Sequence, residues 1–124
     1  MSEQVKTPWE KSVGDIPMHL EYFQGSMFEA VEAIAKQYPN NTAFTFMGSK
    51  TSYKKMIEEI RMCARSLRTL GVRAGDRVTI ALPNCPQAIY MFYAVNAVGA
   101  IANMIHPLSA EKEIEFYLNE SKSV

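Results

Sequence analysis

Apolar side chains recur at helical spacing in two segments of the first half of the chain. Over residues 27–37 they form one face, with Ser26 placed as N-cap, Glu29 three residues later as the acid of a capping box, and Pro39 just beyond the end. A second helix is expected to start near Tyr53, after Thr51 or Ser52 as cap. The apolar positions of this second helix are Met56, Ile57, Ile60, Ala64, Leu67 and Leu70.

The segment between these helices alternates apolar and polar residues, which is typical of a strand that is covered on one face. Residues 43–47 alternate in this way, and residues 50–52 can return as a short partner strand. Gly48 and Ser49 between them suit a two-residue turn with glycine first. The pattern therefore predicts a small β-hairpin.

The second half of the chain alternates strands with helices. Gly71 suits a left-handed helix C-cap, and Gly75 with Asp76 suits a turn. The expected strands are apolar almost throughout, as strands covered on both faces of a parallel sheet are. The predicted elements are strand 77–82, helix 86–98, strand 100–105 and helix 110–119, the last capped by Ser109. The fold class expected is α/β, a partial parallel sheet with flanking helices plus the small β-hairpin.

Residues 88–105 form an apolar run long enough to raise the alternative of a membrane span. Asn96, Gly99 and Asn103 interrupt the run, and β-branched residues gather around Gly99, so a buried helix, a turn and a buried strand are the preferred division. The helix over 86–98 is apolar almost all round, so it needs cover on more than one side.

Residues 1–24 show no sustained period and contain Pro8, Gly14 and Pro17, which predicts an extended arm lying on the body of the protein. Trp9 is its one candidate anchor. The expected organisation is therefore an arm over 1–24 and one structural unit over 25–124.

Composition limits the kinds of partner and the cellular compartment that are expected. Thirteen basic and thirteen acidic side chains leave no net charge and no basic stripe, which argues against nucleic acid as a partner. Cys63 and Cys85 stand in no metal-ligand spacing, and the first twenty residues hold no signal-peptide core, so a cytoplasmic location is expected.

Candidate chemistry is sparse. The six glycines are scattered singly, with no phosphate-binding loop. His106 is the sharper of the two histidines, because it follows a predicted parallel strand, where open α/β sheets bind ligands; His19 has no such context. Residues 111, 113 and 115 are glutamates that read as helix surface rather than as a metal site. No catalytic, cofactor-binding or metal-binding residue is assigned.

Several short motifs, in order and at matching spacing, resemble those of the AMP-forming acyl-CoA synthetases, a family of adenylate-forming ligases. They are Tyr38-Pro39, Thr42-Ala43, Thr51-Ser52-Tyr53, Leu70-Gly71-Val72, Gly75-Asp76-Arg77-Val78, Leu82-Pro83-Asn84-Cys85-Pro86, Gly99-Ala100, His106-Pro107-Leu108 and Leu118-Asn119-Glu120-Ser121. Pro8-Trp9 and Ile16-Pro17, ahead of Tyr22 and Gly25, look most like the long-chain fatty acid–CoA ligase branch.

The resemblance implies a parent enzyme that uses ATP and Mg to convert a carboxylic acid, expected to be a fatty acid, into an acyl-adenylate and then into a CoA thioester. It implies that this chain is the first part of an incomplete N-terminal subdomain, inactive alone, with the remainder of its own polypeptide, the acid and CoA as partners. Self-association of the chain and a peripheral membrane association of the parent are further expectations. An acyl-AMP ligase, a peptide-synthetase adenylation domain and a stand-alone interaction module remain alternatives.

Overall fold

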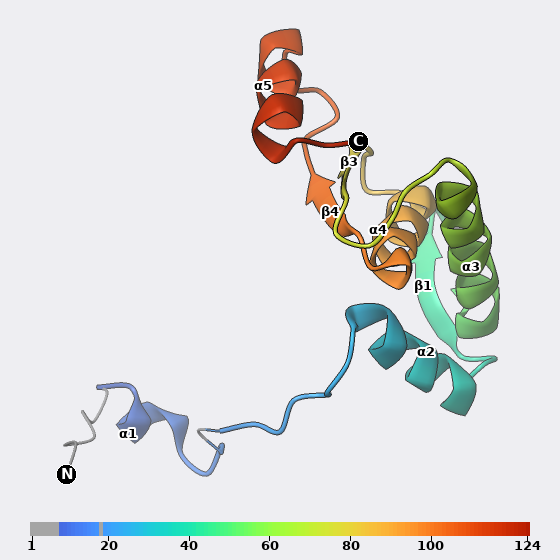
Figure 1. The fold of residues 1–124 in the computed structure, drawn as a ribbon. Coiled ribbons are helices and arrows are strands. Elements are labelled where there is room, and N and C mark those ends of the chain that lie inside the picture. The colour runs from blue at the N-terminus through green and yellow to red at the C-terminus, as the bar shows by residue number, and fades with distance from the viewer. Residues whose placement is uncertain (1–7, 18) are drawn as a thin grey trace.

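The computed structural model describes residues 8–17 and 19–124. Helices α2, α3 and α4 lie together with the hairpin β1–β2, the parallel pair β3–β4 lies beside them, and α5 lies at the far end of that pair (Figure 1). The elements are α1 (Glu10–Val13), α2 (Met27–Gln37), β1 (Thr42–Phe46), β2 (Ser49–Ser52), α3 (Tyr53–Thr69), β3 (Arg77–Ile80), α4 (Pro86–Val98), β4 (Ile101–Met104) and α5 (Glu111–Ser121). The predicted α/β class, with a partial parallel sheet, flanking helices and a hairpin, is confirmed.

The core is shared mainly by α3 and α4, with contributions from α2, from β3 and from Ala100, which directly precedes β4. Ile60 of α3 and Val95 of α4 are completely buried in it. The expectation that α4 needs cover on more than one side is met in part, because its buried residues pack inward while its other apolar side chains are half-buried. The core residues are Ala35, Met56, Ile57, Ile60, Ala64, Leu67, Val78, Ile80, Ala94, Val95, Val98 and Ala100.

Local sequence signals fix the starts of α2 and α3 and the end of α3. The Glu29 backbone N–H donates to Ser26 Oγ, and the Ser26 backbone N–H donates to Glu29 Oε2 at 2.6 Å. These two bonds form the predicted capping box. Ser52 caps α3. Gly71 adopts a φ of 97° after α3, and the Val72 N–H reaches back to the Leu67 carbonyl, as in a Schellman motif.

Two details of the predicted elements are wrong in this region. The hairpin turn is Met47–Gly48 rather than Gly48–Ser49, because both turn residues have positive φ, as a type I′ turn requires, and Phe46 pairs with Ser49. Leu70, expected on the apolar face of α3, is 81 % exposed. It is the C-cap residue, where the chain turns away from the core.

The two strands of the second half run parallel, with Arg77 opposite Ile101 and Ile80 opposite Met104. Both strands are shorter than predicted. The helix between them has the predicted bounds and ends at Gly99, whose φ of 86° is the left-handed conformation favoured by glycine.

The N-cap of α5 is Ala110 and not the predicted Ser109. Because alanine has no capping oxygen, only half of a capping box forms here, in which the Ala110 N–H donates to Glu113 Oε2 at 3.0 Å. None of the residues of α5 is buried. This helix therefore adds no residue to the buried core.

A hydrogen bond that no local sequence pattern predicts joins helix α2 to α4. The Phe28 backbone N–H, in the first turn of α2, donates to Asn96 Oδ1 at 2.9 Å. Asn96, which interrupts the apolar surface of α4, thus satisfies one of the N–H groups that a helix start leaves free.

The described residues before α2 include the short helix α1 and extend away from the rest of the fold (Figure 1). Trp9, the candidate anchor of this arm, is 61 % exposed, so it does not anchor the arm by burial. Within the described residues, none of the helices has both the length and the apolarity needed to cross a membrane.

Candidate functional site at the carboxyl ends of the parallel strands

The loops that follow β3 and β4, together with the end of β4, border an open hollow of about 710 Å³. Parallel strands end at the same edge of a sheet, so the β3–α4 and β4–α5 loops face each other there. The residues that line the hollow are Leu82, Pro83, Asn84, Met104, Ile105, His106, Pro107 and Leu108. We call it the strand-end hollow.

Two polar side chains border the strand-end hollow, Asn84 from the first loop and His106 from the second, and both are exposed. The Leu108 backbone N–H donates to His106 Nδ1 at 3.2 Å, so a neutral His106 ring carries its proton on Nε2. The structure thus brings the predicted candidate His106 to the strand ends. Among the described residues that line the hollow none is acidic, a lysine or an arginine, and His106 is the one side chain there that general acid–base catalysis commonly uses.

A second, smaller hollow of about 330 Å³ lies on the other side of Asn84, between the hairpin and the start of α4. Its lining is almost entirely apolar, with Phe44 and Phe46 from β1 facing Pro86 and Ile89 of α4. The Phe44 ring also contacts the Tyr90 ring, with centroids 6.1 Å apart. Sequence patterns could not show this hollow, because segments some forty residues apart form it.

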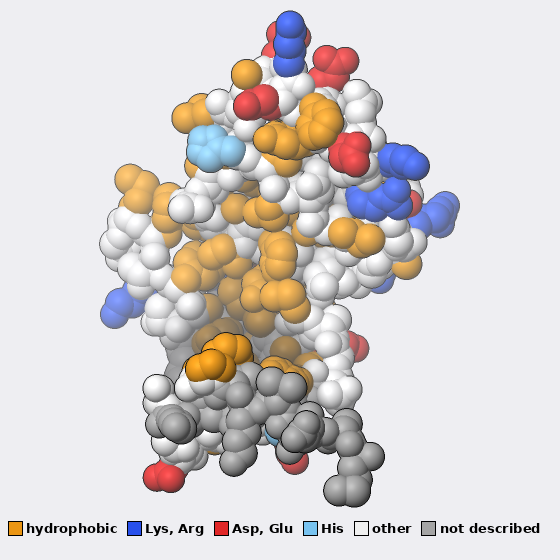
Figure 2. Space-filling model, turned by 90° about the vertical axis from the view of Figure 1, so that its left-hand side faces the viewer, with side chains coloured by type: hydrophobic (Ala, Val, Ile, Leu, Met, Phe, Trp, Pro, Cys, Tyr) orange, Lys and Arg blue, Asp and Glu red, His pale blue; other side chains and the backbone are white. Residues whose placement is uncertain are grey.

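The apolar character continues across one face of the molecule. Figure 2 shows hydrophobic side chains gathered along the middle of this face, with most of the charged side chains towards its upper end and edges. Ile101 and Met104 of β4 are among the large apolar residues exposed on the protein, at 54 % and 50 %. Exposed apolar surface of this kind is typical of contact faces and of ligand-binding grooves.

The other candidate residues stand apart from the strand-end hollow. His19 lies in the arm, and the glutamates at 111, 113 and 115 belong to the surface of α5. Among the described residues no group of three or more histidine, cysteine or acidic side chains is arranged to hold a metal ion. Cys63 and Cys85 are both free and half-buried, and burial raises the pKa of the Cys63 thiol, which makes it a poorer nucleophile.

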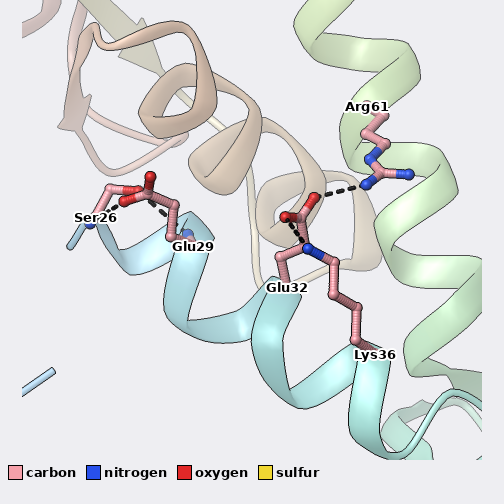
Figure 3. Close-up of polar contacts among 5 residues, drawn as sticks. All are labelled: Ser26, Glu29, Glu32, Lys36 and Arg61. Carbon is pink, nitrogen blue, oxygen red and sulfur yellow. Dashed lines mark hydrogen bonds and ion pairs between the residues drawn. The ribbon is translucent and has the colours of Figure 1, made fainter. Parts of the chain in front are cut away.

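Charged residues meet instead between α2 and α3, where they join the two helices (Figure 3). Glu32 accepts from Arg61 at 2.6 Å and from Lys36 at 3.0 Å. The hydrogen bond from Arg61, and then that from Lys36, lowers the pKa of the Glu32 carboxyl below its ordinary value of 4.5. Arg61, on the charged face of α3, therefore contributes to the packing of α3 against α2.

Replacement of Glu32 by glutamine is expected to make stability less sensitive to acid. Because the pKa of Glu32 is lowered in the folded state, its contribution is complete above pH 4.5 and is lost as pH falls through the folded-state pKa. The pair is partly exposed, so the difference at neutral pH should be below about 1 kcal/mol. Urea unfolding at pH 7 and pH 3 measures it, with Glu58→Gln, an exposed position on α3, as the matched control. An equal acid response of the two variants would contradict the assignment.

Comparison with known proteins points in one direction. A family model described as AMP-binding enzyme matches residues 31–124. A long-chain-fatty-acid–CoA ligase of Bacillus subtilis is 31 % identical over 120 residues, which cover 96 % of this chain and 21 % of that protein. A ligase of the same name from Salmonella typhimurium is 33 % identical over 97 residues, covering 77 % of this chain and 17 % of that protein. The chain thus spans about a fifth of the length of the curated relatives it matches.

Solved structures agree on the fold. The N-terminal domain of FACL13 from Mycobacterium tuberculosis superposes with a TM-score of 0.77 at 27 % identity, covering 81 % of this chain and 26 % of that one. An artificially fused adenylation–PCP di-domain from Klebsiella oxytoca superposes with a TM-score of 0.79 at 22 % identity, covering 82 % of this chain and 19 % of that one. The second likeness concerns the fold alone.

Proposed function

Since the chain belongs to the AMP-binding enzyme family, we propose that it is the first part of the N-terminal subdomain of an AMP-forming acyl-CoA ligase. The longer enzyme would activate a carboxylic acid, most simply a fatty acid, as an acyl-adenylate and transfer the acyl group to CoA. The observation that carries this proposal is the similarity to long-chain-fatty-acid–CoA ligases along 96 % of the chain.

The contribution of this segment is that of a scaffold. Among the described residues that line the strand-end hollow there is no lysine or arginine for the phosphates of ATP or CoA and no carboxylate for Mg²⁺, so these residues do not fit those groups. In this proposal ATP, Mg²⁺ and CoA are held by other parts of the longer protein. Residues 25–124 supply the subdomain framework and residues 1–24 an arm. The cytoplasm is the proposed location, consistent with the two free cysteines.

Two other candidate functions use different chemistry. An acyl-AMP ligase or a peptide-synthetase adenylation domain would form the adenylate but deliver the acyl group to a carrier protein, and the Klebsiella oxytoca structure shows that such domains share this fold. A stand-alone interaction module would catalyse nothing. The exposed apolar face is also compatible with that role.

Pyrophosphate exchange separates these functions when it is measured on the 124-residue chain and on the longer protein that contains it. With ATP and a panel of fatty acids, we expect acid-dependent exchange by the longer protein and none by the 124-residue chain. Thioester formation with CoA then distinguishes the ligase from a carrier-dependent enzyme. Exchange catalysed by the 124-residue chain alone would overturn the scaffold proposal, and a longer protein that forms adenylate but no thioester would favour the second candidate.

A further inference from the structure

Three arginines of α3 line one open hollow where α2, α3 and α4 meet. Arg61, Arg65 and Arg68 are four and three residues apart, so they lie on the same face of the helix. The hollow has a volume of about 250 Å³. The other residues that line it are apolar and come one each from α2, α3 and α4, namely Phe28, Ala64 and Ala97. We call it the arginine hollow.

The positive charge of the arginine hollow is only partly compensated. Among the described side chains, neither Arg65 nor Arg68 forms an ion pair. Arg61 pairs with Glu32 at 2.6 Å through one amino nitrogen, which engages only part of its five N–H donors (Figure 3). Because arginine stays protonated in proteins, these like charges repel one another until an anion lies among them.

A neighbouring hollow between α2 and α3 shows the contrast. It shares Arg61 and has further cationic side chains, but the carboxylates of Glu32 and Glu58 line it as well. In the part of the chain that the structure describes, the arginine hollow has no carboxylate in its lining. Composition does not reveal this local excess, because the chain as a whole has equal numbers of basic and acidic side chains.

The arrangement favours a phosphoryl group over a carboxylate as the anion. Each guanidinium is a planar fork that can donate to two oxygens at once. A carboxylate has two oxygens and is satisfied by one fork, whereas a phosphoryl group has three terminal oxygens and can accept from several arginines. The helix rise separates Arg61 from Arg68 by only about 10 Å, so these long side chains can reach one such group. Their apolar neighbours lower the local dielectric constant and so strengthen the attraction.

We propose that the arginine hollow is a binding site for a phosphoryl group, held by Arg65 and Arg68 and completed by Arg61. The group is carried either by a soluble phosphate or by the headgroup of a lipid, because both present the same oxygens. This site shares no lining residue with the strand-end hollow, and it does not depend on the ligase proposal.

The test follows the backbone amide resonances of the isotope-labelled chain while inorganic phosphate is added, with sodium chloride keeping the ionic strength constant. We expect saturable shifts that centre on residues 61–68. The double variant Arg65→Gln/Arg68→Gln should bind phosphate about tenfold or more weakly, because hydrogen bonds from charged groups are lost.

The matched control is the double variant Lys50→Gln/Lys55→Gln. It removes the same charge from β2 and from another face of α3, and it should weaken phosphate binding by less than about threefold, because exposed distant charges are screened. All four substituted side chains are exposed, so both double variants should keep the fold, which far-ultraviolet circular dichroism verifies.

Vesicles distinguish the two sources of the phosphoryl group. Sedimentation of the chain with phosphatidylcholine vesicles that contain phosphatidic acid, but not with phosphatidylcholine alone, would assign the hollow to a lipid headgroup. This binding should be lost in the arginine double variant and kept in the lysine double variant. Saturable binding of inorganic phosphate without sedimentation would assign the hollow to a soluble phosphate.

Three other results would overturn the proposal. The first is the absence of both a saturable shift at residues 61–68 and sedimentation with the vesicles. The second is equal weakening by the two double variants, which would show a diffuse effect of charge and not a site. The third is tighter binding of a hexaglutamate peptide than of phosphate, which would assign the hollow to an acidic protein segment. None of these measurements uses ATP, a fatty acid or CoA, so their failure leaves the ligase proposal standing.

Discussion

Replacing Ile60 with alanine is expected to lower the free energy of unfolding by about 2–5 kcal/mol. Ile60 is completely buried in the cluster that α3 and α4 share, so the substitution removes apolar contacts and leaves a cavity that neighbouring side chains fill only in part. Urea unfolding followed by far-ultraviolet circular dichroism measures the loss. It should appear as a lower midpoint with an unchanged slope.

Met62→Ala is the matched control, because Met62 lies on the same helix but is 51 % exposed. Its effect should stay within about 0.5 kcal/mol. If Ile60→Ala does not fold, Ile60→Val removes a single methylene and should cost about 0.5–1.5 kcal/mol. Similar losses for Met62→Ala and Ile60→Ala would show that α3 does not pack through the face seen here.

Asn96→Leu should cost about 1–3 kcal/mol, although the substituted residue becomes more apolar inside an apolar helix. The loss arises because the Phe28 N–H at the start of α2 is left without its acceptor. Exchange of the Phe28 amide should accelerate together with the fall in stability. Both are measurable on the same sample by hydrogen exchange and urea unfolding.

Asn96→Asp separates this hydrogen bond from general packing. Aspartate keeps an acceptor oxygen at the same place and sets a negative charge against the N-terminal end of α2, which the helix dipole favours. It should therefore destabilise less than leucine at neutral pH. If aspartate is as harmful as leucine, the contact between Asn96 and Phe28 is not what holds α2 to α4.

Features set by neighbouring residues could be predicted from the sequence. The capping box of Ser26 and Glu29 and the helix that runs from Pro86 to Gly99 both depend on residues a few positions apart. The hairpin turn lies one residue earlier than predicted, because Met47 adopts a positive φ. The prediction had placed glycine first in the turn, since glycine favours that conformation. The partner of Asn96 lies 68 residues away, so no local pattern could have indicated it.

Only the general position of the candidate site could be predicted from the sequence. His106 could be placed at the end of a parallel strand, and the structure puts it there. Asn84 borders both hollows, but the sequence did not indicate it as a site residue. An asparagine with a proline nearby on each side is typical of a loop. The hollows themselves depend on how segments far apart in the sequence face each other, and that is a tertiary property.

The exposure of Trp9 has a practical consequence for spectroscopy. It is the single tryptophan of the chain and lies outside the core, so its emission should resemble that of the free amino acid in water and respond little to urea. Tryptophan fluorescence is therefore a poor probe of unfolding here, but a clean probe of the arm. A blue shift of the Trp9 emission on mixing with another protein would show that the arm contacts an apolar surface, whether or not the rest of the fold changes.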